Sequence, residues 1–168
     1  MQNPRQQKIA ESAVRVLAKE GARGLAHRAV DREAGLPTGS TSYYANSRME
    51  LLRLALTHVM EHDRETFQKY IGPGVGVALE ELLEALSAPE EREFSLARFE
   101  LYLEAARNAE FQKLMEAHRR EFIGLAAAAL ELQGAENPRA EAVALITASE
   151  GKLFQTLVFS AADWLEGE

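Results

Sequence analysis

The chain has 168 residues and a mass of 18.6 kDa, enough for about one ordinary domain or for a small module joined to a modest one. With 46% hydrophobic and 27% charged residues, it is neither a disordered chain nor a membrane protein. Its longest purely apolar run, residues 125–130, is far shorter than the roughly 20 residues that a bilayer crossing needs. The absence of cysteine excludes disulfides, thiolate catalysis and cysteine-ligated metals. Because the N-terminus also carries no apolar signal segment, we expect a cytoplasmic protein.

The charge is unevenly distributed along the chain. The formal net charge is −7, which argues against a surface that binds nucleic acid everywhere. Residues 1–50 nevertheless hold eight basic and five acidic residues, a net of +3, whereas the remainder holds 11 basic and 21 acidic residues, a net of −10. This asymmetry predicts that only the N-terminal part meets a polyanion. Short segments also fluctuate by a few charges, so that ordinary explanation stays open.

Helical spacing of apolar residues, interrupted by clusters of glycine and proline, predicts an all-α protein. The first helix buries Ile9, Ala13, Val16 and Leu17 on one face and stops at Gly21. The expected helices run over about residues 4–20, 27–34, 38–44, 47–70, 77–88, 90–107, 110–133 and 138–165.

Three helix starts carry capping signals. Ser47 and Glu50 form an S-x-x-E capping box, and Ser87 and Glu90 repeat it. Asn137 followed by Pro138 has the form of an N-cap and first-turn proline. The glycine-rich residues 72–76 are the best candidate for a boundary loop.

Two short helices joined at residues 35–37 would bury little surface alone. They can share a small core with the first helix through Leu17, Val30, Ala34 and Leu36, which predicts a helix-turn-helix whose second helix enters the major groove of DNA. Gly35 supplies the positive φ of the turn, and we expect Gly39 to permit a close helix approach. A solvent-exposed loop rich in hydroxyl groups is the alternative. The side chains expected on the exposed surface are Thr38, Ser40, Thr41, Ser42, Tyr43 and Tyr44.

Residues 34–51, AGLPTGSTSYYANSRMEL, resemble the signature of the TetR family of bacterial repressors, and the resemblance extends from about Arg5 to Val59. It implies a three-helix DNA-binding module, residues 1–46, followed by a helical effector-binding and dimerisation domain, residues 47–168. The sequence departs from the family pattern in three places. Ala26 replaces a capping Thr or Ser, Thr41 and Ser42 replace an apolar residue and tyrosine, and Ala45 replaces phenylalanine.

The resemblance also implies roles for individual residues of the module. Thr38, Gly39 and Tyr43 would face base edges, and Ser40 could contact either bases or phosphates. Tyr44 and Arg48 would hold phosphates, although Tyr44 could instead be half-buried and Arg48 could instead pair with a carboxylate. The full predicted DNA-binding set is Arg28, Thr38, Gly39, Ser40, Ser42, Tyr43, Tyr44 and Arg48.

The acidic remainder holds every phenylalanine and the tryptophan. By resemblance, the helix over residues 90–107 lines a ligand cavity, whereas an ordinary packed core explains the same residues equally well. The last two helices carry more apolar surface than a small domain can hide, which favours a homodimer over a monomer that buries them internally. The predicted cavity residues are Phe67, Phe99, Tyr102, Phe111, Met115, His118, Phe122 and Phe154, and the predicted dimer residues are Leu125, Ile146, Gly151, Leu153 and Leu157.

An enzyme is the weaker hypothesis. His58 and His62 have the i, i+4 spacing of metal ligands, but Val59 breaks the H-E-x-x-H pattern. Glu100 and Glu104 could form an acid–base pair, although Arg107 suggests a simple ion pair. The sequence therefore predicts no enzyme, cofactor or metal, but a dimeric repressor that binds a palindromic operator in double-stranded DNA and is released by a small apolar effector. It would lie in the cytoplasm, on the nucleoid when bound to DNA. A helical protein-binding or scaffolding module remains the alternative, and neither the effector nor the operator can be identified.

Overall fold

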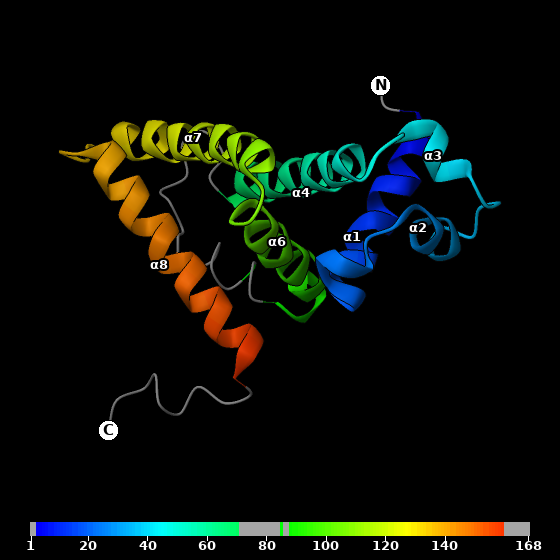
Figure 1. Ribbon diagram of the computed structural model, residues 1–168. Coiled ribbons are helices and arrows are strands. Elements are labelled where there is room, and N and C mark those ends of the chain that lie inside the picture. Colours follow the sequence, from blue (N-terminus) through cyan, green and yellow to red (C-terminus); the bar gives the residue numbers. More distant parts are fainter. Residues whose placement is uncertain (1–2, 71–84, 86–87, 160–168) are drawn as a thin grey trace. The chain divides into compact units, whose positions relative to one another are not determined.

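The computed structural model describes residues 3–70, 85 and 88–159, and these contain helices and connections but no strand. The fold is therefore all-α, as the apolar spacing predicts. In chain order the elements are α1 (Pro4–Gly24), α2 (His27–Glu33), α3 (Ser40–Tyr44), α4 (Arg48–Tyr70), the short 3-10 helix η1 (Pro89–Glu91), α6 (Arg92–Ala105), α7 (Ala109–Leu132) and α8 (Pro138–Val158), as Figure 1 shows.

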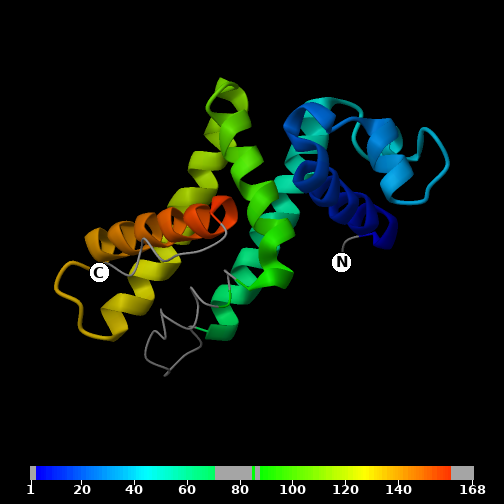
Figure 2. The ribbon, with the colours of Figure 1, turned by 90° about the horizontal axis from the view of Figure 1, so that it is seen from below.

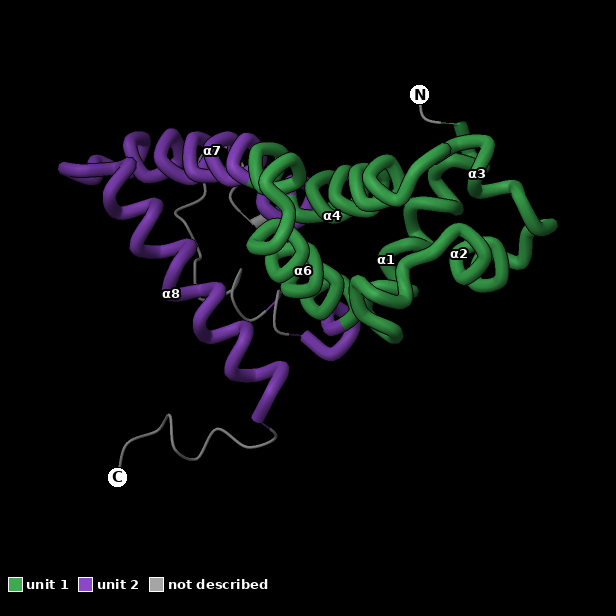
Figure 3. Tube along the Cα trace, in the orientation of Figure 1, with its two compact units in different colours: residues 1–63, 93–115 green, residues 64–92, 116–168 purple. Residues whose placement is uncertain are grey.

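The chain packs into two compact units, drawn in separate colours in Figure 3. Unit 1 consists of Met1–Asp63 and Glu93–Met115, and unit 2 of Arg64–Arg92 and Glu116–Glu168. Unit 1 therefore contains the three N-terminal helices together with most of α4, almost all of α6 and the start of α7. In both Figure 1 and Figure 2, α1, α2 and α3 lie together at one end of α4.

One hydrophobic core holds unit 1 together. The predicted α1 stripe of Ile9, Ala13, Val16 and Leu17 is almost completely inaccessible to solvent. The same core contains residues of α2, α4, α6 and the start of α7. The N-terminal helices therefore do not have a separate hydrophobic core. The larger side chains that they meet are Leu25, Val30, Leu51, Leu52, Leu56, Val59, Leu101 and Phe111.

Local signals fix where several helices begin and end. Gly21 has φ 70° and breaks the helical backbone of α1 directly after the predicted end at Glu20. At the start of α4, Glu50 N donates to Ser47 Oγ at 3.2 Å, while the Glu50 carboxylate accepts from Asn46 N at 2.7 Å. This is the predicted capping box, with the return hydrogen bond moved one residue toward the N-terminus.

Unit 2 has its own smaller core between α7, α8 and the end of α4. Its buried residues are Phe67, Ile123, Ala126, Ala142 and Ile146. Ion pairs of Arg64 with Glu121 and of Arg119 with Glu150 join the same helices near the surface. None of the helices that the structure describes combines the length and the hydropathy of a bilayer-crossing segment.

Some predicted boundaries differ from the structure. The second short helix begins at Ser40 rather than Thr38, because Gly39 adopts left-handed backbone dihedrals. The last helix ends at Val158, well before the predicted residue 165, because Phe159 is extended. Asn137 precedes α8 as predicted, but its side chain makes no capping hydrogen bond. The helix expected over residues 77–88, and the capping role of Ser87, fall almost entirely outside the described residues.

Candidate nucleic-acid interface

Two glycines shape the turn between α2 and α3. Gly35 has φ 61°, the positive φ that the sequence predicts for this turn. Gly39 has φ 93°, and a Cβ added there would meet no described atom within 4 Å. The predicted reason for Gly39, a close helix approach, is therefore wrong. Glycine is needed at this position because the backbone is left-handed where α3 begins.

A buried carboxylate holds this turn from inside. Asp31 of α2 accepts hydrogen bonds from the backbone N–H of Gly39 at 2.7 Å, the N–H of Thr41 at 2.8 Å and the Thr41 hydroxyl at 2.6 Å. Burial alone would raise the pKa of the Asp31 carboxyl. The three hydrogen bonds and the nearby His27 outweigh burial and hold that pKa below its usual value. We call these contacts the Asp31 network.

Thr41 has the opposite orientation from the one predicted. Its hydroxyl is predicted to lie on the exposed surface of α3, whereas the residue is completely buried and its side chain faces Asp31. Where the family pattern has an apolar residue, this chain therefore buries a threonine that is paired with an aspartate. The sequence feature that could have indicated this pair is Asp31 itself, an acidic residue in the short helix that contributes Val30 and Ala34 to the core.

The other polar residues near α3 lie mostly at the surface. Thr38, Gly39 and Ser42 are exposed, and Ser40 is half-buried. Tyr43 is 85% exposed. Tyr44, by contrast, is half-buried against the core, with its ring edge-to-face to Tyr43 at a centroid distance of 5.0 Å. Thr38, Ser42 and Tyr43 are therefore accessible to a partner, whereas Tyr44 has a structural role in unit 1.

Two alanines that depart from the family pattern, Ala26 and Ala45, affect the ends of α2 and α3. Ala26 provides no side-chain cap for α2. His27, the first residue of α2, instead bonds through Nε2 to the Ala45 carbonyl oxygen at 2.7 Å, which joins the start of α2 to the end of α3. Ala45 itself is fully buried, so the smaller side chain still fills a core position. Arg28, the next residue of α2, is exposed.

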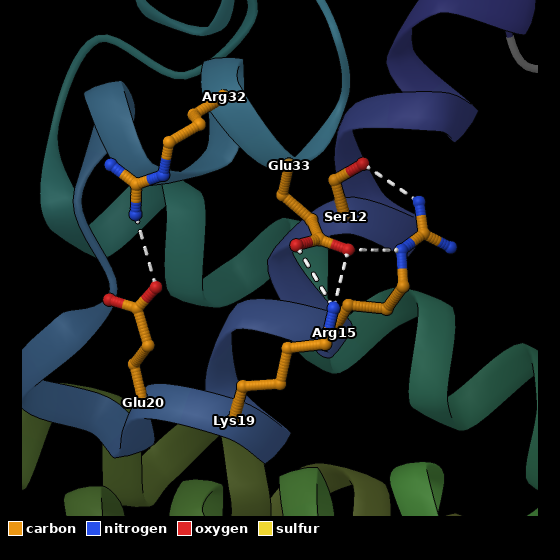
Figure 4. Close-up of polar contacts among 6 residues, drawn as sticks. All are labelled: Ser12, Arg15, Lys19, Glu20, Arg32 and Glu33. Carbon is orange, nitrogen blue, oxygen red and sulfur yellow. Dashed lines mark hydrogen bonds and ion pairs between the residues drawn. The ribbon is translucent and has the colours of Figure 1, made fainter.

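Figure 4 shows a polar network that ties α1 to α2. The Glu33 carboxylate accepts from Arg15 Nε at 3.1 Å and from Lys19 Nζ at 2.9 Å, and Arg32 pairs with Glu20 at 3.1 Å. The hydrogen bond from Lys19 is the main reason that the pKa of Glu33 lies below its usual value. These partly exposed pairs fix the orientation of α2 more than they add stability.

Ion pairs within unit 1 neutralise part of the basic charge of residues 1–50. Of the eight basic residues in this segment, Arg15, Lys19, Arg32 and Arg48 form ion pairs within unit 1. The remaining four are exposed and have no ion pair within the part of the chain that the structure describes. They are Arg5, Lys8, Arg23 and Arg28.

Arg48, predicted by resemblance to hold a phosphate, makes internal contacts instead in this structure. Its guanidinium donates to the Glu104 carboxylate of α6 at 2.7 and 3.0 Å and to the Ala22 carbonyl oxygen at 2.9 Å. The hydrogen bond to Glu104 raises the pKa of Arg48, and the same bond lowers the pKa of Glu104. Pairing with a carboxylate is the alternative expected for Arg48 from its sequence.

The predicted cavity residues divide between the two units. In unit 1, Phe111 and Met115 are core residues with Tyr102 packed beside them, and Phe99 lies edge-to-face with Tyr102 at 5.9 Å. In unit 2, the Phe122 ring contacts Phe67 edge-to-face at 5.4 Å and lies 6.2 Å from His118. Phe154, on α8, is 47% exposed.

The residues predicted for a dimer interface also differ in exposure. Leu125 and Gly151 lie at the surface and Leu157 is half-buried, whereas Ile146 and Leu153 are buried within their own subunit. Three large apolar residues of α8 are also exposed. They are Val143, Phe154 and Val158.

The paired histidines of α4 contact an aromatic ring. His62 stacks on Phe94 at a centroid distance of 3.8 Å, and His58 lies 5.6 Å from the same ring. Among the described residues, no group of three or more potential ligands is arranged to hold a metal ion. Glu100 and Glu104 of α6 bond to different partners, since Glu100 accepts from the Ala22 N–H and Glu104 from the Arg48 guanidinium.

A helix-turn-helix held together by a buried carboxylate, with a polar and aromatic surface on its second helix, defines a helical DNA-binding regulator of transcription. Residues 75–166, more than half of the chain, match the family model for the C-terminal domain of tetracycline repressor-like proteins. The chain belongs to the TetR family of transcriptional regulators. No curated protein matches it.

Solved structures agree with this assignment. A member of the TetR family from Streptomyces coelicolor is 27% identical, with a TM-score of 0.73 over 93% of this chain and 88% of that one. The multidrug binding protein EbrR, in complex with malachite green, is 26% identical, with a TM-score of 0.71 over 94% of this chain and 90% of that one. A transcriptional regulator from Rhodococcus shares the fold at 16% identity, with a TM-score of 0.79 over 90% of this chain and 83% of that one.

Proposed function

We propose that this protein is a cytoplasmic repressor that binds a palindromic operator as a homodimer and dissociates from it when a small molecule binds the helical body. The observation that carries the proposal is the surface of α3 and the residues before it, where Thr38, Ser42 and Tyr43 are exposed while the Asp31 network fixes the turn behind them. Hydroxyl groups can donate to base edges or phosphates, and an aromatic ring can contact a thymine methyl group. We assign no catalytic activity and no cofactor to the chain.

We assign the DNA contacts according to which side chains are exposed to solvent. Thr38, Gly39 and Tyr43 read base edges, and Ser40 and Ser42 contact either bases or the backbone. Arg28, exposed and without an ion pair among the described residues, supplies a phosphate or groove contact. In this proposal residues 1–46 form the DNA-binding domain and residues 47–168 the effector and dimerisation domain, although α1–α3 share a core with α4 and α6.

A gel shift with DNA from upstream of the protein's own gene tests the DNA-binding proposal. Arg28→Ala should weaken binding to all sequences alike and lower the slope of log affinity against log salt by about 1, because one phosphate contact is lost. Arg139→Ala, at an exposed position of α8, is the matched control and should leave the slope unchanged. If wild-type protein gives no retarded band at moderate salt, the helical scaffolding alternative is favoured.

We propose that the dimer forms through the exposed apolar residues of α8. Val143, Phe154 and Val158 are spaced so that they follow one side of this helix, and Gly151 on the same side is exposed with no described side chain near it. Two copies would thereby place two DNA-binding heads on half-sites roughly 34–36 Å apart. Ile146 and Leu153 would support this face from the core of each subunit rather than touch the partner.

Phe154→Glu should raise the dissociation constant of the dimer by about 30-fold or more, because it places a charge at the centre of an apolar interface. Leu132→Glu is the matched control, since Leu132 is 86% exposed at the end of α7 and should not affect the dimer. Sedimentation velocity over a range of protein concentrations measures both. A Phe154→Glu variant that remains as dimeric as the control would exclude this face.

An aromatic effector is the ligand class that we propose for the body. EbrR, the relative that binds malachite green and ethidium in its crystal structures, supports this choice. The net charge of −10 after residue 50 favours a cationic ligand over an anionic one. In α8, Gln155 Oε1 is buried and has no hydrogen-bond partner among the described residues, so it could accept a hydrogen bond from such a ligand. A gel shift tests release of the protein from DNA. Adding a cationic aromatic compound should remove the retarded band and leave the migration of free DNA unchanged.

A further inference from the structure

Two glutamates of α6, one helical turn apart, hold the end of α1 and the start of α4. Glu100 Oε2 accepts a hydrogen bond from the Ala22 N–H at 2.8 Å. Glu104 is bonded twice by the Arg48 guanidinium, which also donates to the Ala22 carbonyl oxygen at 2.9 Å. Both backbone polar groups of Ala22 are thus tied to the same helix, one directly and the other through Arg48. We call this set of four residues the Ala22 latch.

The backbone around the Ala22 latch is shaped for these contacts. Gly21 adopts φ 70°, which ends the regular part of α1 and turns the Ala22 N–H toward α6. A Cβ at Gly21 would lie 3.2 Å from the Glu100 carboxylate, so glycine also leaves room for that side chain. The Glu104 side chain is only 14% exposed. The Arg48 side chain is 44% exposed, so the pair is only partly shielded from water, but its bidentate geometry makes it stronger than an ion pair with a single contact.

The same geometry opposes the role that the family resemblance gives to Arg48. Nη1 donates to Glu104, and Nη2 donates to both Glu104 and Ala22. The Glu104 carboxylate therefore neutralises the charge of the guanidinium, and a DNA phosphate would have to compete with it for the same cation. A phosphate contact from a guanidinium already paired with a carboxylate adds less to DNA affinity than one from Arg28, which has no ion pair among the described residues.

We infer that Arg48, Glu100 and Glu104 are positioning residues for DNA binding, which they serve by fixing α1–α3 relative to α6, and that Arg48 makes no phosphate contact. This inference rests on the proposed function. Since both carboxylates belong to α6, that helix determines the position of the DNA-binding head at two points within unit 1. The latch therefore identifies the contacts that orient the DNA-binding helices, and it pairs the charge of Arg48 with Glu104 rather than with DNA.

Conservative variants separate the two roles of Arg48. Glu104→Gln and Arg48→Lys should each weaken operator binding by about tenfold, because each removes charge-assisted bidentate hydrogen bonds. The slope of affinity against salt should stay unchanged in both variants and in Arg48→Ala. Glu110→Gln is the matched control, since its exposed pair with Arg53 joins α4 to the start of α7 outside the latch, and it should bind DNA normally. If Arg48 holds a phosphate, Arg48→Ala lowers the slope by about 1 and Glu104→Gln leaves binding unchanged or tighter, which would overturn the inference.

A measurement without DNA distinguishes failure of the latch from failure of the proposed function. Hydrogen exchange of the Ala22 amide, followed by NMR, should become at least tenfold faster in Glu104→Gln, because loss of the Arg48 bridge loosens Ala22. Amides in the middle of α7 serve as the reference for global opening. Faster exchange at Ala22 in a protein that binds no DNA would support the latch and overturn the proposed function. Normal DNA binding with unchanged exchange and affinity in Glu104→Gln would overturn the latch alone.

Discussion

Asp31→Ala should lower the free energy of unfolding by about 2–4 kcal/mol, because it leaves three hydrogen-bond donors without an acceptor. Two of these donors belong to Thr41, which is completely buried and cannot turn to water, and the third is the Gly39 N–H. Since these donors fix the start of α3, operator binding should fall at least tenfold even where the protein remains folded. Urea unfolding followed by circular dichroism measures the first effect, and a gel shift measures the second.

Two further variants show whether the loss comes from the Asp31 network. Thr41→Val removes only the hydroxyl group, and the double variant Asp31→Ala/Thr41→Val should cost less than the sum of the single changes by about 0.5–3 kcal/mol. Glu33→Ala is the matched control, because its pairs with Arg15 and Lys19 are partly exposed and should contribute at most about 1 kcal/mol. Equal costs for Asp31→Ala and Glu33→Ala would contradict the proposed importance of the network.

The same network makes stability depend on pH in a defined direction. The pKa of Asp31 in the folded protein lies below its value in the unfolded chain, which is about 3.9. Its contribution to stability is therefore complete above the unfolded pKa and is lost as pH falls toward the folded pKa. The difference in unfolding free energy between wild-type protein and Asp31→Asn should be largest near neutral pH and should shrink below about pH 4.

Much of the backbone was predictable because its signals are local. Gly21 and Gly35 adopt positive φ and end helices where the sequence indicates, and Ser47 caps α4. Each feature depends on residues within a few positions of one another, so the sequence alone contains the information. The apolar stripe of α1 is predictable for the same reason, since helical spacing determines which residues share a face.

The side-chain partners were not predictable in the same way. Arg48 and Glu104 are 56 residues apart, and their spacing does not indicate that α6 brings a carboxylate to the start of α4. Gly39 was correctly singled out for the wrong reason, because its positive φ depends on how Asp31 holds the turn. Long helices add a second difficulty. Phe154 and Leu153 are adjacent and equally apolar, yet only the tertiary packing of α8 determines which one the subunit buries.

A buried ion pair between α4 and α6 supports the second large expected effect. Arg98 pairs with Asp63, and their side chains are only 8% and 11% exposed. Arg98 Nε also lies 3.4 Å from the second Asp63 oxygen. Arg98→Met should lower the free energy of unfolding by about 3–5 kcal/mol, because the Asp63 carboxylate then loses its principal cationic partner in a nearly solvent-free position. Thermal and urea unfolding measure the loss.

The double variant Asp63→Leu/Arg98→Met distinguishes loss of a contact from exposure of an unpaired charge. Replacing both partners with apolar side chains should recover most of the lost stability, since a buried pair roughly balances its own desolvation. Arg53→Met is the matched control, because its pair with Glu110 is exposed and should contribute at most about 1 kcal/mol. If the double variant were as unstable as Arg98→Met alone, the pair would matter through its specific hydrogen-bond geometry. Arg98→Met with the small cost of the control would instead show that Asp63 reaches water or another donor when Arg98 is removed.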